Sequence, residues 1–343
     1  MPLATNAAVQ DRNFSQADEV EAIAADLLQG LQYSLVSAAA HPEIRLPFGS
    51  LEEAFQEAIG IRPAEQRWVY HARARRIALG SPAARQAAFG RYGMFGAEEF
   101  AWGGLEIVHR HLSEQRSILR SRRMMTASSS PRDHQPASAS PRTLALHITD
   151  VGCIDRAAHA RPGDEIAVSG LAIDADGGVT RVPRFVVRDD FENGVRKEYG
   201  VPGRRFCEFP VPETLDARPR VYAAAAFLEV ADRAGVAERL AVAWGRATPI
   251  LRRAMEVGGP ALHAAPIARI SAWLLEHFVR WLGETFEDDV IPPGLAFAGV
   301  QASPVRPLGS TRREITGASE QFTFAGLRGR YRIGGQWRER WEP

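Results

Sequence analysis

The stretch MMTASSSPRDHQPASASPRTLALHI, residues 124–148, divides the chain into two parts with different sequence patterns. Its first part, residues 124–142, consists mainly of serine, proline, alanine and polar residues, which bury too little apolar surface to offset the entropy lost on ordering. In its second part apolar side chains occupy alternate positions, at Leu144, Leu146 and Ile148, which is the period of a β-strand. We therefore expect a flexible linker over the first part and a β-rich domain from the second part onwards.

Before this stretch, apolar residues recur with the period of an α-helix. Residues 15–38 contain the clearest example, in which the spacing i, i+3, i+4 and i+7 places several side chains on one face. These are Val20, Ile23, Ala24, Leu27, Leu28, Leu31 and Leu35. Ser15 with Asp18 matches the capping-box pattern, so the helix is predicted to begin there.

More helices follow in the N-terminal part. Ser50 lies three residues before an acidic residue and predicts a second capping box, while Pro63 suits the first turn of a third helix. A last helix is predicted from Glu98 to the start of the linker. Residues 1–123 are therefore expected to form an all-α domain.

Residues 143–343 contain many short strand patterns, which is typical of a β-sandwich or barrel. The turns between them contain Asp-Gly and Asn-Gly pairs, whose residues tolerate positive φ. Two helical segments, 237–257 and 267–286, interrupt the strands. The sequence thus predicts an α+β multidomain protein: an all-α region, a flexible linker, and a β-sandwich that carries a two-helix insertion at 237–286.

Charge and residue content exclude several classes of function. The formal net charge is +1, which does not favour nucleic acid or a membrane surface as the main partner. Lys197 is the only lysine and no glycine-rich turn suitable for a P-loop precedes it; a pyridoxal Schiff base or a kinase-type lysine would have to be Lys197 itself. No secretory signal is visible, so we expect a cytoplasmic protein, or one exported without a signal peptide.

Acidic residues in the predicted loops are candidates for a metal site. Asp174 and Asp176 share one turn, Asp189 and Asp190 share a second, and Asp232 follows a buried strand. If the fold brings these loops to one end, their oxygens suit a hard cation such as calcium. The alternative is that the aspartates only shape hairpin turns.

Cys153 is a weak candidate for a catalytic nucleophile, because His147 lies nearby in the sequence and a Cys–His pair can activate a thiolate. The alternative is a buried structural thiol. With Cys207 the chain has two cysteines, enough for at most one disulfide.

The second predicted inserted helix has a strongly apolar stripe with an aromatic edge. Trp273, Phe278 and Trp281 lie on it and could contact a protein partner or a membrane surface. The alternative is that the stripe packs on the sheet.

Five segments of the second half resemble a known type of domain. They are Asp164-Glu-Ile166, Asp189-Asp-Phe-Glu-Asn-Gly194, Phe227-Leu-Glu-Val-Ala-Asp232, Glu287-Asp-Asp289 and Gly329-Arg-Tyr331. Across residues 143–343 they resemble an uncharacterised bacterial β-sandwich type that is C2-like in outline, and so similar to calcium- and lipid-binding domains. The resemblance implies interaction loops that use calcium. Asp174 and Asp176 form the one Asp-x-Asp pair in these loops, whereas C2 domains carry such pairs in two loops.

Two classes of function remain open. The first is a non-enzymatic binding or assembly protein, whose sandwich loops engage a protein partner, with calcium as the one candidate cofactor, and whose helical region docks it to a larger complex. The alternative is a bacterial effector or toxin-like protein, either hydrolytic or membrane-active through the inserted helices. The substrate or partner and the oligomeric state do not follow from the sequence.

Overall fold

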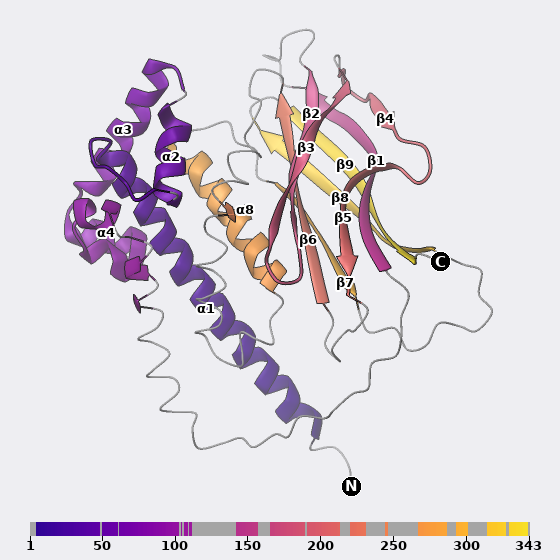
Figure 1. The fold of residues 1–343 in the computed structure, drawn as a ribbon, viewed down its shortest axis with the longest axis horizontal. Coiled ribbons are helices and arrows are strands. Elements are labelled where there is room, and N and C mark those ends of the chain that lie inside the picture. Colours follow the sequence, from indigo (N-terminus) through magenta and orange to yellow (C-terminus); the bar gives the residue numbers. More distant parts are fainter. Residues whose placement is uncertain are drawn as a thin grey trace. The chain divides into compact units, whose positions relative to one another are not determined.

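The computed structural model of the protein is shown in Figure 1. It describes residues 5–48, 50–60, 62–102, 104, 106–108, 110–111, 142–156, 165–188, 191–212, 220–230, 244–245, 267–286, 293–300, 314–326 and 329–341. The chain divides into a helical unit, Met1–Ser128 with Val242–Phe278, and a two-sheet unit, Ser129–Ala241 with Val279–Pro343. N-terminal helices and C-terminal antiparallel strands confirm the predicted α+β class.

The helical unit begins with four α-helices and a short 3-10 helix. They are α1 (Thr5–Ala40), α2 (Leu51–Gly60), α3 (Ala64–Ala78), α4 (Pro82–Phe89) and η1 (Gly90–Met94). Residues 97–102, 104, 106–108 and 110–111 are also helical. The backbone N–H of Glu53 donates to Ser50 Oγ over 3.1 Å, which confirms the helix start predicted at Ser50.

The predicted start of the first helix is wrong. Ser15 lies inside α1, so it does not cap the helix. No glycine or proline occurs between Thr5 and Ser15, and since each added residue gains one helical hydrogen bond, nothing local ends the helix at the serine.

The C-terminal part of α1 is buried on every side, from Leu31 to Ala40, where the sequence predicted a single apolar face. The last carbonyls of a helix have no partner within the helix, and burial makes that costly. Side chains of the next helices supply the donors: Gln56 Nε2 donates to Ala38 O over 2.8 Å, and Arg75 Nε donates to Ala40 O over 3.1 Å. α2 and α3 therefore hold the end of α1 through its backbone as well as through packing.

The two-sheet unit contains two antiparallel sheets. One has the order β4–β1–β9–β8, with β5 also paired to β1, and the other has the order β3–β2–β6–β7. The bounds are β1 (Arg142–Arg156), β2 (Ile166–Ile173), β3 (Val179–Arg188), β4 (Arg196–Glu198), β5 (Arg204–Val211), β6 (Arg220–Val230), β7 (Gly294–Val300), β8 (Glu314–Gly326) and β9 (Gly329–Trp341).

Both sheets contribute to one hydrophobic core. Phe209 of β5 lies against Tyr222 of β6, with 5.0 Å between the ring centroids. Gly170 of β2 faces Phe206 of β5 so closely that a Cβ atom at this position would lie 2.3 Å from the ring. The absence of a side chain at Gly170 therefore allows strands of different sheets to approach each other.

The segments that connect these elements agree only in part with the sequence predictions. α8 (Ile267–Phe286) has the bounds predicted for the second inserted helix. The first inserted helix and the linker lie outside the described residues, except for the helical Trp244 and Gly245 and for Arg142, which begins β1. Val242–Phe278 groups with the N-terminal helices, although the sequence placed it in the β-domain.

Candidate functional site

Asp174 shapes the turn between β2 and β3. Its Oδ1 atom accepts the backbone N–H groups of Asp176, over 2.9 Å, and of Gly178, over 2.7 Å. Asp176 Oδ2 lies 3.7 Å from Arg220 Nη1. Asp174 thus stabilises its own hairpin turn, whereas the carboxylate of Asp176 lies near the first residue of β6.

The other acidic candidates, Asp189, Asp190 and Asp232, lie outside the described residues. Within the described ranges, no group of three or more His, Cys, Asp or Glu side chains is placed to hold a metal ion. The calcium site remains a prediction.

The structure does not bring Cys153 and His147 together. Both lie on β1, six residues apart, which corresponds to about 20 Å along a strand. Cys153 points into the core, where it is 3% exposed, whereas His147 lies between the core residues Leu146 and Ile148 and so faces the other side of the sheet. Residues an even number apart normally share a face of a strand. Here the pairing with β9 is irregular between Ile148 and Asp150, so the side chains after this point occupy the opposite face.

α8 buries one of the three aromatic residues predicted to form a partner or membrane face. Phe278 is 3% exposed and packs on Trp244, with 6.1 Å between the ring centroids, so it belongs to the packing of the helix instead of to a free surface. Trp273 is partly exposed and stacks on His277, while Trp281 packs on Phe286. None of the helices within the described ranges is long and apolar enough to cross a membrane.

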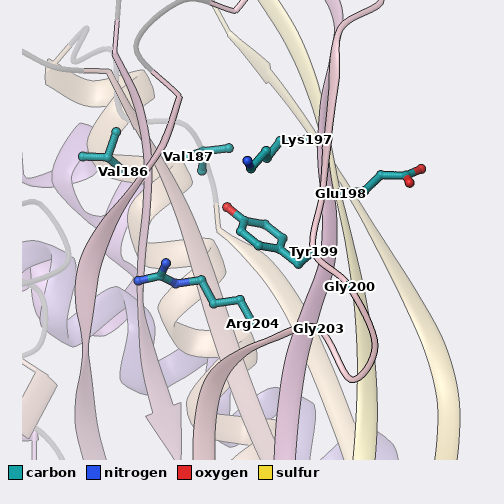
Figure 2. Close-up of a pocket in the computed structure, with 8 residues that line it drawn as sticks. All are labelled: Val186, Val187, Lys197, Glu198, Tyr199, Gly200, Gly203 and Arg204. Atoms are coloured by element: carbon teal, nitrogen blue, oxygen red, sulfur yellow. The ribbon is translucent and has the colours of Figure 1, made fainter.

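An open pocket of about 540 Å³ lies between β3 of one sheet and the β4–β5 segment of the other (Figure 2). None of the sequence patterns above indicated this pocket. It is lined by Val186, Val187, Lys197, Glu198, Tyr199, Gly200, Gly203 and Arg204. Figure 2 shows Lys197, Tyr199 and Arg204 pointing towards β3, whereas Glu198 points away.

β4, β5 and the loop between them place these three side chains on one wall. The backbone N–H of Tyr199 donates to Thr149 O over 2.9 Å and extends the pairing of β4 with β1 by one residue. Gly203 has φ +97°, and a Cβ atom there would lie 2.8 Å from Ile148 O, so this turn requires glycine. After it, Arg204 pairs with Ile148 on the same strand, β1.

Phe185 of β3 contacts two of the pocket side chains. The guanidinium carbon of Arg204 lies 4.1 Å from the centroid of the Phe185 ring, which is a cation–π contact. The Tyr199 ring meets the same ring edge to face, with 6.3 Å between the centroids and an interplanar angle of 81°. One aromatic residue of the second sheet therefore orients an arginine and a tyrosine of the first.

The hydroxyl of Tyr199 is buried and has no hydrogen-bond partner within the described part of the chain. Burial raises the pKa of Tyr199, and the positive charge of Arg204 partly opposes this shift. The phenol is therefore protonated at neutral pH and can donate a hydrogen bond. A buried polar group without a partner is costly, so an acceptor supplied by a ligand would be favourable here.

Two cations of the pocket lack an ion pair among the described residues. Nearby acidic side chains are already engaged: Glu198 and Asp150 pair with Arg196, and Glu208 pairs with Arg205. Lys197 and Arg204 form no such pair within the described ranges, and both are exposed. Positive charge that no protein group neutralises attracts an anion.

Comparison with protein-family models, with curated proteins and with solved structures found no match to this chain.

Proposed function

We propose that this is a non-enzymatic binding or assembly protein, whose two sheets form a β-sandwich and hold an anionic group of a protein partner in the pocket of Lys197, Tyr199 and Arg204. The single observation that carries the proposal is the convergence of these three side chains on one open pocket. The pocket is formed by a loop at the edge of the two-sheet unit, which fits a protein that engages its partner through loops.

The chemistry of the lining supports capture of an anion. An arginine presents its N–H groups in a fixed plane and binds carboxylate or phosphate through two of them at once. The guanidinium of Arg204 lies against the buried ring of Phe185, and since this contact already orients it, less order has to be gained on binding. Lys197 adds a second charge and the Tyr199 hydroxyl a directional donor.

Calcium bound to the acidic loops remains part of the proposal, with Asp189, Asp190 and Asp232 as its candidates beyond Asp174 and Asp176. The helical unit would then dock the protein to a larger assembly.

The single lysine provides a direct test. We expect a hexaglutamate peptide to slow acetylation of Lys197 by an amine-reactive ester, as measured by mass spectrometry, whereas a hexaglutamine peptide does not. Arg204→Gln should remove the protection, because it removes the second charge of the pocket. Arg205→Gln is the matched control, because Arg205 is exposed, pairs with Glu208 and does not line the pocket. Equal acetylation rates with and without hexaglutamate would contradict the proposal.

A further inference from the structure

The charge of the pocket indicates what kind of anion it holds. Lys197 and Arg204 together provide two positive charges without an acidic partner in the described residues, and the one acidic side chain of the lining, Glu198, points away. A phosphate monoester carries between about −1.5 and −2 at neutral pH, whereas a carboxylate carries −1. From this balance we infer that the anionic group is a phosphate monoester on a side chain of the protein partner, an inference that rests on the proposed function.

The donors of the pocket also match a phosphate. Arg204 has its face on Phe185, which leaves the N–H groups at its edge for two phosphate oxygens. The protonated hydroxyl of Tyr199 can donate to an oxygen, and Lys197 can reach the remaining one as a point charge. A carboxylate, with two oxygens, would leave part of this donor set unused.

The size and the opposite wall of the pocket indicate that more than a phosphate enters. Its volume of about 540 Å³ is in the range of sites for small organic ligands and exceeds what one inorganic ion fills. Val187 of β3 supplies an apolar side chain on the opposite wall, on which the carbon atoms of a phosphorylated side chain can pack, whereas the adjacent Val186 points to the other face of the strand. We therefore place the phosphate at Arg204 and the side-chain carbons against Val187.

A membrane is the less favoured source of the phosphate. The loop beside the pocket exposes one large apolar residue, Val201, which is 91% exposed. Stable attachment of a protein to a lipid surface requires a larger apolar area or several cations beside it. Lys197 and Arg204 are instead directed into the pocket.

The experiment compares four probes by calorimetric titration of the full chain: N-acetyl-phosphotyrosine amide, N-acetyl-phosphoserine amide, N-acetyl-glutamate amide and inorganic phosphate. We expect at least one phosphorylated amino acid to bind about tenfold or more tightly than both the glutamate compound and inorganic phosphate, because a charge-assisted hydrogen bond is stronger with the dianion. Arg204→Gln and Lys197→Met should each weaken that binding by about tenfold, while Arg205→Gln leaves it unchanged.

The outcomes separate this inference from the proposed function. If the glutamate compound binds as tightly as the phosphorylated ones, the inference of a phosphate monoester is wrong, while the proposed capture of an anion stands. If inorganic phosphate binds equally well, the pocket is a site for a small anion and the side-chain part of the inference is overturned. A parallel titration uses vesicles that contain phosphatidic acid, and tighter binding to them than to the four probes would assign the phosphate to a lipid. If none of the probes binds, the proposed function is contradicted as well.

Discussion

The guanidinium of Arg204 lies on the ring of Phe185, 4.1 Å from its centroid, and joins the two sheets at the edge of a basic pocket. Phe185 is buried in the shared core, so its ring is a fixed surface. Arg204 is exposed and comes from the neighbouring sheet. A buried aromatic residue thus sets the orientation of an exposed cation, and the pocket depends on the packing of the core beneath it.

Replacing Phe185 with leucine should loosen Arg204 without removing any charge. A cation–π contact at an exposed site contributes about 0.5–1 kcal/mol, so we expect the protection of Lys197 by hexaglutamate to need roughly two- to fivefold more peptide. The substitution keeps an apolar residue in the core and should reduce the free energy of unfolding by about 1 to 1.5 kcal/mol, measured by urea denaturation. Unchanged protection would show that the stack does not orient Arg204.

Tyr199→Phe should affect stability and binding in opposite directions. The Tyr199 hydroxyl is buried without a partner in the described residues, so its removal should leave the unfolding free energy unchanged or raise it by up to about 1 kcal/mol. The same change removes a donor from the pocket and should weaken binding of the tightest anionic probe several-fold. A variant that loses stability and binds normally would show that the hydroxyl serves the fold alone.

Gly203→Ala should destabilise the loop that carries the pocket. Its φ of +97° is unfavourable for alanine, and the added Cβ would lie 2.8 Å from Ile148 O. We expect a loss of at least about 1 kcal/mol in urea denaturation together with weaker protection of Lys197. Gly194→Ala is the comparison, because Gly194 also has positive φ but nothing lies within 4 Å of its added Cβ. An equal loss in both variants would show that strain in φ, and not the contact with Ile148, limits the loop.

Gln56→Ala should destabilise the helical unit by about 1 kcal/mol, because it removes the donor to Ala38 O at the buried end of α1. Gln66→Ala, at an exposed position of α3, provides a control that should change the unfolding free energy by less than about 0.5 kcal/mol. Thermal denaturation followed by circular dichroism measures both. Equal effects would mean that the carbonyl finds another donor.

Both thiols should be inert in the native protein. Cys153 and Cys207 are buried and form no disulfide, and burial raises the pKa of the Cys207 thiol to about 12. The thiolate is the reactive form, so alkylation of the native chain at pH 8 should be at least about a hundredfold slower than in urea. Rapid alkylation of Cys153 would reopen its role as a nucleophile.

The elements that follow from the sequence are those with a strong local pattern. α8 has the predicted bounds because its apolar stripe is continuous over the whole helix, and Ser50 marks the start of α2 through a local hydrogen bond. β7 has no such pattern, because Gly-Leu-Ala-Phe-Ala-Gly-Val has little contrast between alternate positions. The helix start predicted at Ser15 was wrong, because a capping pattern does not end a helix whose preceding residues can also be helical.

The pocket could not be predicted, because its residues meet only where β3 of one sheet lies opposite the β4–β5 segment of the other. Phe185 has the alternating pattern of an ordinary core residue, and nothing local links it to Arg204. Two sequence signals do mark the wall of the pocket: the one lysine of the chain, and the glycines at 200 and 203 that enclose a short turn. The sequence instead indicated a metal site at the acidic turns, although the Asp174 side chain accepts hydrogen bonds from the backbone of its own turn.

The most direct test of anion capture uses the magnetic resonance signal of Lys197. Protein labelled with ¹³C-lysine gives one set of lysine side-chain signals, since the chain contains a single lysine. We expect titration with hexaglutamate to shift the ε-methylene signal of Lys197 to saturation and hexaglutamine to leave it in place. Arg204→Gln should strongly weaken the shift, while Arg205→Gln should preserve it. A signal that stays in place with hexaglutamate and with the phosphorylated amino acids would contradict the capture of an anion by this pocket.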